Sequence, residues 1–190
     1  MGEILPKFRK SNKSAASVQE ILSHVARLKA WIPFYKSTQD SITGKNLPSF
    51  YSKKWSRKHR IRVAKNLYLD KNYKDSILEH IKLADQRERE GYKYSDLGYY
   101  LFKEALEKKY RKSLDKLTDE FLYKPIGANR TSYLPLQKFA KKRIIPTEKD
   151  DYYRNQLVHG YVHDMGAAMQ GGVGGHAGLF ANANDIAKIM

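Results

Sequence analysis

The chain has 190 residues, of which 41% are hydrophobic and 29% are charged. This length and composition suit a folded domain rather than a disordered tail. The formal net charge is +16, from 36 Lys and Arg against 20 Asp and Glu. There is no cysteine, which excludes disulfides and thiolate chemistry. No apolar run approaches the roughly 20 residues that span a bilayer, so no transmembrane segment is expected.

Helical spacing dominates the first half of the chain. Ser17 and Glu20 form a capping-box pattern, and the apolar residues behind them predict a helix to about Leu28. Residues 37–57 are rich in Ser, Lys and Asn, so we expect a long excursion outside the core. Two further helices and a charged break are predicted after it: Ile61–Leu69, Ile77–Leu83 and Asp85–Gly91.

The second half repeats this pattern with more interruptions. A helix is predicted from Leu97 to about Lys109, and Ser113 can cap a short helix that ends at Lys124–Gly127. Short strands are expected at Arg143–Ile145 and Ala177–Phe180. A last helix, capped by Asn182 or Asn184, begins near Asp185. The predicted fold class is therefore mainly α with few short strands.

Basic residues gather in three stretches, at residues 53–62, 108–112 and 141–143. Such charge favours binding to nucleic acid, anionic glycans or lipid headgroups, although charge runs are commonly only a solvated surface. The alternative function is therefore a basic helical module that binds nucleic acid or anionic glycan through residues 53–62, where Trp55 interleaves with the charges. No recognised nucleic-acid motif accompanies this stretch.

Two short motifs could carry chemistry. Tyr94-Ser95-Asp96 stands just before a predicted helix, and Ser95 or Asp96 could simply be its N-cap. The glycine-rich stretch 171–178 could suggest a phosphate cradle, but no Gly-Lys-Ser/Thr follows it. We interpret these glycines as residues that permit positive φ and close backbone approach.

Histidines offer a possible metal site. His159 and His163 are four residues apart and could share one helix face, with Asp164 and His176 nearby. A hydrolytic zinc motif requires a glutamate directly after the first histidine, but Gly160 stands there. We therefore predict no metal and no cofactor.

Taken together, Tyr94-Ser95-Asp96-Leu97-Gly98, Val162-His163-Asp164 and the stretch from Gly171 to Phe180 resemble the serine β-lactamase and penicillin-binding-protein superfamily. The resemblance implies the central, helix-rich portion of the α/β (α+β) β-lactamase/transpeptidase-like fold. It also implies that Tyr94 is the general base and that Asp96, with Ser95 beside it, lies on the substrate side of the site. The family usually has Asn where this chain has Asp96, and a carboxylate accepts hydrogen bonds without donating.

The family's other two motifs are not evident. The sequence Ser113-Leu114-Asp115-Lys116 has the Ser-x-x-Lys pattern, but it follows the tyrosine motif, so we interpret Ser113 as a helix cap. Residues 21–28 resemble the segment after the nucleophile helix and keep His24 and Leu28. We therefore expect residues 1–190 to be a partial serine hydrolase domain, with the nucleophile before residue 1 and the Lys-Thr-Gly motif after residue 190. A tyrosine, with an ordinary pKa near 10, needs nearby cations to act as a base, so we expect no activity from this chain alone.

The sequences of residues 93–98, 145–150 and 162–164 are similar to those of family members that are fused to a glycoside hydrolase domain of the β-N-acetylglucosaminidase type. That similarity implies an extracytoplasmic enzyme that acts on a small-molecule or peptidoglycan-derived substrate. It makes nucleic acid an unexpected partner. A truncated, inactive gene product is a third possibility.

Overall fold

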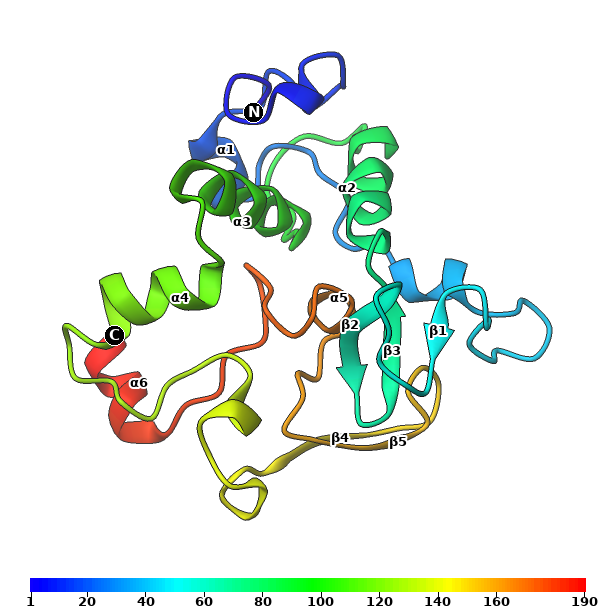
Figure 1. Cartoon of the computed structure of the whole chain (residues 1–190). Coiled ribbons are helices and arrows are strands. Elements are labelled where there is room, and N and C mark those ends of the chain that lie inside the picture. Colours follow the sequence, from blue (N-terminus) through cyan, green and yellow to red (C-terminus); the bar gives the residue numbers. More distant parts are fainter. The chain divides into compact units, whose positions relative to one another are not determined.

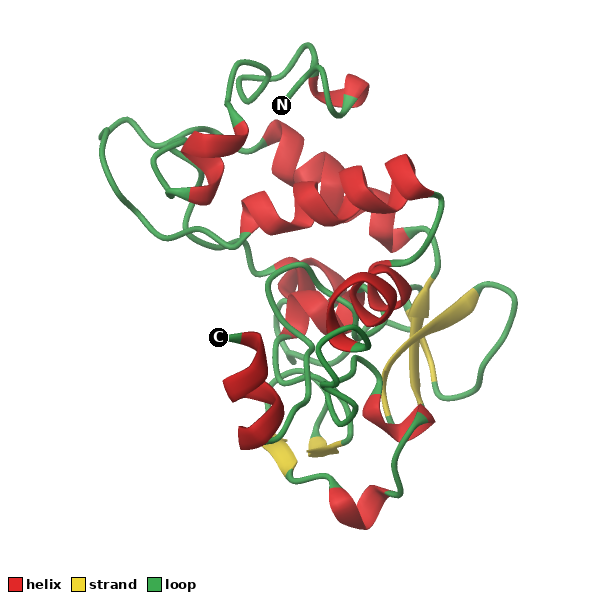
Figure 2. Ribbon diagram, turned by 90° about the vertical axis from the view of Figure 1, so that its left-hand side faces the viewer, coloured by secondary structure: helices red, strands yellow, loops and turns green.

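The computed structural model describes residues 1–190 and contains more helix than strand, at 35% and 13% of the chain. The predominance of helix over strand is confirmed, and Figure 2 shows how short the strands are. The chain divides into two compact units, residues 1–32 with 74–111 and residues 33–73 with 112–190. No helix is both long and apolar enough to cross a bilayer.

The first unit contains three helices, α1 (Val18–Leu22), α3 (Leu97–Tyr110) and nearly all of α2 (Tyr73–Leu83), together with a 3-10 turn at Pro6–Phe8 (Figure 1). Helix α3 packs closely on α1, because a Cβ atom on Gly98 would lie 2.2 Å from Ile21 Cγ2. The buried Lys13 ends α2 by donating to the carbonyls of Lys82 and Ala84. A cation is stabilising at the carboxyl end of a helix, where the last carbonyl groups have no partner within the helix.

The second unit contains two small antiparallel sheets. The first has the strand order β1-β3-β2, formed by β1 (Tyr51–Ser52), β2 (His59–Ala64) and β3 (Leu67–Asp70) (Figure 1). The second pairs β4 (Pro146–Asp150) with β5 (Gln156–His159).

Short helices and turns complete this unit. The α-helices are α4 (Leu114–Thr118), α5 (Met165–Met169) and α6 (Ala183–Ile189), and a π-helical turn, Asp119–Tyr123, follows α4. The 3-10 turns are Phe34–Thr38, Pro135–Gln137 and Lys141–Arg143. Helix α5 contacts strand β2 and the turn Phe34–Thr38.

A chain of buried hydroxyl groups joins the two sheets of the second unit. Thr38 Oγ1 lies 2.8 Å from the Tyr51 hydroxyl, which lies 2.9 Å from the hydroxyl of the fully buried Tyr153. Burial raises the pKa of Tyr51 to about 12, although hydrogen bonds from Thr38 and Tyr153 partly oppose it. Residues 37–57 are therefore not wholly outside the core, and that expectation was wrong at Thr38 and Tyr51.

Predictions that rest on local signals are confirmed. Ser17 and Glu20 form both bonds of the capping box, Asn182 caps α6, and α2 and α3 lie where the periodicity places them. Helix α1, however, ends at Leu22 rather than near Leu28. His24 and Arg27 adopt left-handed backbone, and the amides of Val25 and Ala26 both donate back to the Glu20 carbonyl, so the helical hydrogen-bond pattern stops there.

Other predictions were wrong, and at residues 61–69 the cause is that a strand period was read as a helix period. Residues 61–69 form the β2–β3 hairpin, in which exposed Arg60 and Arg62 alternate with inward residues and Asn66 has φ of 51° at the turn. Near residue 145, a 3-10 turn ends at Arg143 and the strand begins only at Pro146. Ala177–Phe180 contributes one bridge, between Phe180 and Ser132, rather than a strand.

Candidate functional site

The Tyr94-Ser95-Asp96 motif forms the turn that leads into α3. Helix α3 begins at Leu97, and Asp96 occupies the N-cap position without making a side-chain capping bond. Ser95 instead accepts a hydrogen bond from the Leu97 amide at 3.3 Å. The motif therefore lies at the amino end of a fourteen-residue helix of the first unit, as its sequence position predicts.

Ser95 fixes this turn through three hydrogen bonds. Its hydroxyl donates to the Lys29 carbonyl at 2.6 Å and accepts from Leu97. Its amide donates to His24 Nδ1 at 3.2 Å. Because its hydroxyl already donates to a carbonyl, the Ser95 side chain is suited to hold the turn in place.

The side chain of Tyr94 remains accessible. The residue is 53% exposed, and its ring lies 4.7 Å from the His24 ring between centroids. Tyr92 contacts the same imidazole edge-on, with 5.9 Å between the ring centroids. His24 thus orients the ring of Tyr94 and binds the amide of Ser95, a role that the sequence did not reveal.

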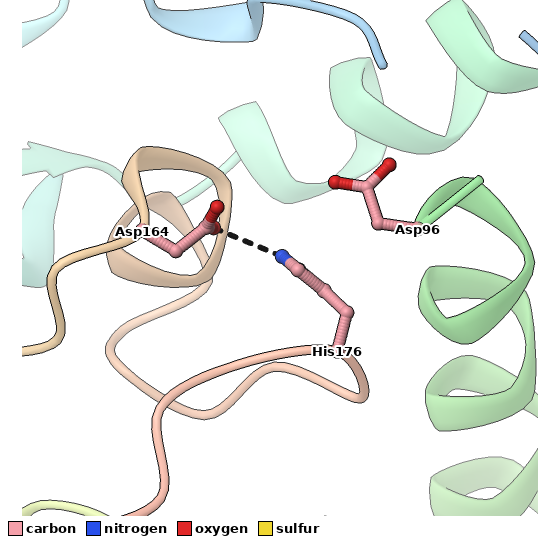
Figure 3. Close-up of side chains that lie close together, drawn as sticks. All are labelled: Asp96, Asp164 and His176. Carbon is pink, nitrogen blue, oxygen red and sulfur yellow. Dashed lines mark hydrogen bonds and ion pairs between the residues drawn. The ribbon is translucent and has the colours of Figure 1, made fainter. Parts of the chain in front are cut away.

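In the second unit, Asp164 and His176 join the glycine-rich stretch to α5. The Asp164 carboxylate accepts from the Ala167 amide at 2.6 Å, which caps α5. His176 Nε2 lies 2.9 Å from the same carboxylate oxygen, and Figure 3 shows the imidazole directed at it. Burial would raise the pKa of Asp164, but the bonds from His176 and Ala167 outweigh burial, so that pKa is lowered.

The glycine-rich stretch follows a tight path that requires glycine at Gly178. This residue has φ of 115°, and a Cβ atom there would lie 2.4 Å from the Gly172 carbonyl oxygen. No other residue type could follow that path without moving the backbone. The expectation of positive φ and close backbone approach is confirmed here.

Arg154 anchors the chain just before Asp164. Its side chain is fully buried and donates to Asp150 at 2.5 Å and to Glu148 at 3.1 Å. It also donates to the carbonyls of Val162 and His163, each at 2.6 Å. This residue could not be predicted from the sequence, because its partners come together only after β4 and β5 pair.

The histidine spacing does not form a helical metal motif. His159 ends strand β5, and its Nε2 atom lies 2.6 Å from the Ile144 carbonyl oxygen. His163 lies beyond a turn, is largely exposed, and places Nδ1 3.7 Å from Glu148. The expectation of one shared helix face was wrong.

An open groove of about 1100 Å³ lies within the second unit, slightly larger than the roughly 300–1,000 Å³ of most ligand-binding clefts. Apolar residues form much of its wall, and His176, Arg130 and Arg143 also line it. Its principal lining residues are Arg130, Pro135, Phe139, Arg143, Ile144, Ile145, Asp164, His176, Leu179 and Phe180.

Comparison with known proteins identifies the family. A model of the beta-lactamase family matches residues 2–190, nearly the whole chain. The chain belongs to the beta-lactamase family. Tyr94, Ser95 and Asp96 all lie inside the matched range, as do Asp164 and His176.

Two curated relatives of this beta-lactamase family member have names from cell-wall metabolism. A "Putative D-alanyl-D-alanine carboxypeptidase" of Escherichia coli K12 is 37% identical over 131 residues, which cover 62% of this chain and 30% of that protein. An "N-acetylmuramyl-L-alanine amidase" of Bacillus subtilis strain 168 is 40% identical over 109 residues, covering 51% of this chain and 25% of that one. The chain therefore matches less than a third of the length of either relative.

A solved structure supports the same fold. The crystal structure of a "putative beta-lactamase" from Bacteroides dorei DSM 17855 aligns with a TM-score of 0.51 and 15% sequence identity. The alignment covers 98% of this chain and 39% of that one. At this identity the match shows a shared fold, so the beta-lactamase-like fold that the resemblance implied is supported.

Proposed function

We propose that this chain is the central part of a serine hydrolase that transfers an acyl group from an amide or ester substrate to a serine. The observation that carries the proposal is that Tyr94 is exposed on a turn that hydrogen bonds of Ser95 hold in place. The chain around it matches the beta-lactamase family over residues 2–190. A base must be accessible to reach the proton that it removes, and its position must be fixed to do so efficiently. The Tyr94 turn meets both requirements.

The three motif residues take different parts in this proposal. The Tyr94 hydroxyl is the general base toward the nucleophilic serine. Asp96 lies on the substrate side, where its carboxylate would favour a hydrogen-bond donor of the substrate. Ser95 takes a positioning part, because its hydroxyl already donates to the Lys29 carbonyl.

The nucleophile is proposed to lie outside these 190 residues, as is the Lys-Thr-Gly motif. Ser113 is the residue before α4 and has extended backbone, with φ of −66° and ψ of 150°, as a helix N-cap does. Its position after the tyrosine motif also disfavours it as the nucleophile. We therefore propose that the isolated chain turns over no substrate.

The names of the relatives support a substrate class. One is named for D-alanyl-D-alanine and the other for N-acetylmuramyl-L-alanine, both peptidoglycan-related groups. We propose a peptidoglycan-derived peptide or a small amide or ester as the substrate, and a location outside the cytoplasm. Fusion to a glycoside hydrolase domain of the β-N-acetylglucosaminidase type remains a prediction from the sequence.

Acylation by a fluorescent penicillin tests the role of Tyr94 in the complete protein that contains this chain. We expect Tyr94→Phe to lower the acylation rate by about 10² to 10⁴-fold, the usual contribution of a general base. Tyr92→Phe is the matched control, because Tyr92 is exposed, contacts the same imidazole and lies two residues away. We expect its rate to stay within about twofold of wild type, since it has no part in the proposed proton transfer.

The isolated chain gives a second, separate result. After incubation with the penicillin, intact-mass measurement should find no adduct. An adduct on Ser113, or on any other serine of this chain, would contradict the proposed position of the nucleophile. Equal acylation rates for Tyr94→Phe and wild type in the complete protein would contradict the role of Tyr94.

A further inference from the structure

A basic segment stands out on the surface of the second unit. We use "cationic segment" for residues 52–62, which form the loop after β1 and the first part of β2 and contain six Lys and Arg residues and no acidic residue. All six are exposed: Lys53, Lys54, Arg57, Lys58, Arg60 and Arg62. Only Lys58 makes an ion pair, with Asp70 at 3.7 Å. The positive charge of this segment is therefore almost uncompensated by nearby acids.

The loop of the cationic segment is held in one shape by its own serines. Ser52 Oγ accepts from the Lys54 amide at 3.1 Å and donates to the Lys54 carbonyl at 2.8 Å. Ser56 Oγ accepts from the His59 amide at 2.9 Å. Between these fixed points Trp55 remains 63% exposed. The indole is therefore displayed to solvent by an ordered loop rather than packed into the core.

Strand β2 extends the same charge along the sheet. Arg60 and Arg62 are exposed, while Val63, the next residue, is buried. The Arg62 guanidinium lies over the ring of Tyr161 at 5.2 Å and over that of Tyr68 at 5.8 Å. These contacts, together with the hydrogen bond between the Arg62 side chain and Tyr161, hold the guanidinium in place.

We propose that the cationic segment docks on the surface of an anionic phospholipid bilayer. Two pairs of cations, Lys53 with Lys54 and Arg57 with Lys58, flank the exposed indole of Trp55. Lys and Arg bind anionic headgroups, and an indole prefers the boundary between headgroups and acyl chains. One exposed loop therefore presents both kinds of group that a bilayer surface binds.

A linear polyanion fits this surface less well. Proteins that bind single-stranded nucleic acid hold it in a charged groove and stack bases on several aromatic residues. Trp55 and the six cations are absent from the walls of the groove described above, and the loop presents one exposed indole. The sequence predicted a basic helical module at residues 53–62 as the alternative. That prediction was wrong about the helix, because these residues form a loop and a strand.

Sedimentation with lipid vesicles tests the charge requirement on the 190-residue chain. We expect binding to phosphatidylcholine vesicles that contain about one third phosphatidylglycerol, and none to pure phosphatidylcholine, at about 0.15 M salt. K53E/K54E should weaken binding by about 30-fold or more, from about tenfold per 1.4 kcal/mol and about 1 kcal/mol for each cation. K141E/K142E is the matched control, since it makes the same charge change at exposed lysines of the same unit and should weaken binding less than fivefold.

Fluorescence tests the position of the indole. The chain has two tryptophans, so Trp31→Phe leaves Trp55 as the sole reporter. We expect anionic vesicles to shift its emission to shorter wavelength and brominated lipids to quench it. Four results would overturn the proposal: no binding at this salt concentration, equal weakening by both double variants, unchanged Trp55 emission, or tighter binding to RNA or DNA than to the vesicles.

Discussion

The Tyr94 turn of the first unit and the Asp164 segment of the second unit are held in different ways. Hydrogen bonds between neutral groups hold the first, from the Ser95 hydroxyl to the Lys29 carbonyl and from its amide to His24. Charged groups hold the second, with the Asp164 carboxylate bonded to His176 and Arg154 buried just upstream. Charge-assisted hydrogen bonds are roughly twice as strong as neutral ones. Damage to the second region should therefore cost more stability than damage to the first.

Replacing Arg154 should have the largest effect. Arg154→Met leaves the fully buried Asp150 carboxylate without its cation, and removal of one partner of a buried pair typically costs about 3–5 kcal/mol. It also removes the donors to the Val162 and His163 carbonyls, which position the chain before Asp164. The free energy of unfolding, measured by urea denaturation with circular dichroism, checks this value.

The pH dependence of the unfolding free energy of the same variant tests whether loss of the ion pair causes the destabilisation. Burial would raise the pKa of Asp150, but bonds from Arg154 and from backbone amides outweigh burial and lower it. The stabilisation is therefore complete above the ordinary carboxyl pKa of about 3.9 and is lost as the pH falls from there through the lowered pKa. The difference between wild type and Arg154→Met should narrow below about pH 4. A difference that stays constant down to pH 2 would show that lost packing, rather than charge, causes the destabilisation.

Substitution of Asp164 should have an intermediate effect and can separate its two roles. Asp164→Ala removes both the cap of α5 and the partner of His176, and loss of a cap alone costs about 0.5–2 kcal/mol. Asp164→Asn keeps an acceptor for the Ala167 amide but loses the charge. We expect losses of about 2 kcal/mol for Ala and about 1 kcal/mol for Asn in urea denaturation. Equal losses would mean that the cap contributes nothing beyond the bond to His176.

The helices and caps that neighbouring residues determine were predicted correctly from the sequence. The Ser17 capping box, the Asn182 cap and the long helix after Asp96 depend on residues a few positions apart. Helix α1 was predicted too long, because the backbone turns left-handed at His24, which the apolar spacing up to Leu28 does not reveal. The β2–β3 hairpin was missed although Arg60 and Arg62 alternate with inward residues, a period of two that outweighs helical spacing.

In the candidate site, too, the parts set by neighbouring residues could be predicted and the parts set by distant residues could not. The motif placed Tyr94 at the start of α3 because motif and helix are adjacent in sequence. Its supports, His24 and Lys29, lie 71 and 66 residues away from Ser95, so no local pattern could connect them. The same limit applies to Arg154, whose charge looks like that of any surface arginine until β4 and β5 pair around it.

Substitution of His24 should have the smallest effect of the three, and it should be local. His24 has φ of 59°, a conformation that both Gly and Asn tolerate, so the two variants differ mainly in whether an acceptor remains for the Ser95 amide. His24→Gly removes a hydrogen bond worth about 1 kcal/mol, so hydrogen exchange of the Ser95 amide, followed by NMR, should accelerate about fivefold. In His24→Asn the amide oxygen can take the place of Nδ1, and exchange should stay near the wild-type rate. Equal exchange rates in the two variants would mean that the Lys29 contact alone holds the turn, and the contrast between a turn held by His24 and a segment held by charge would then fail.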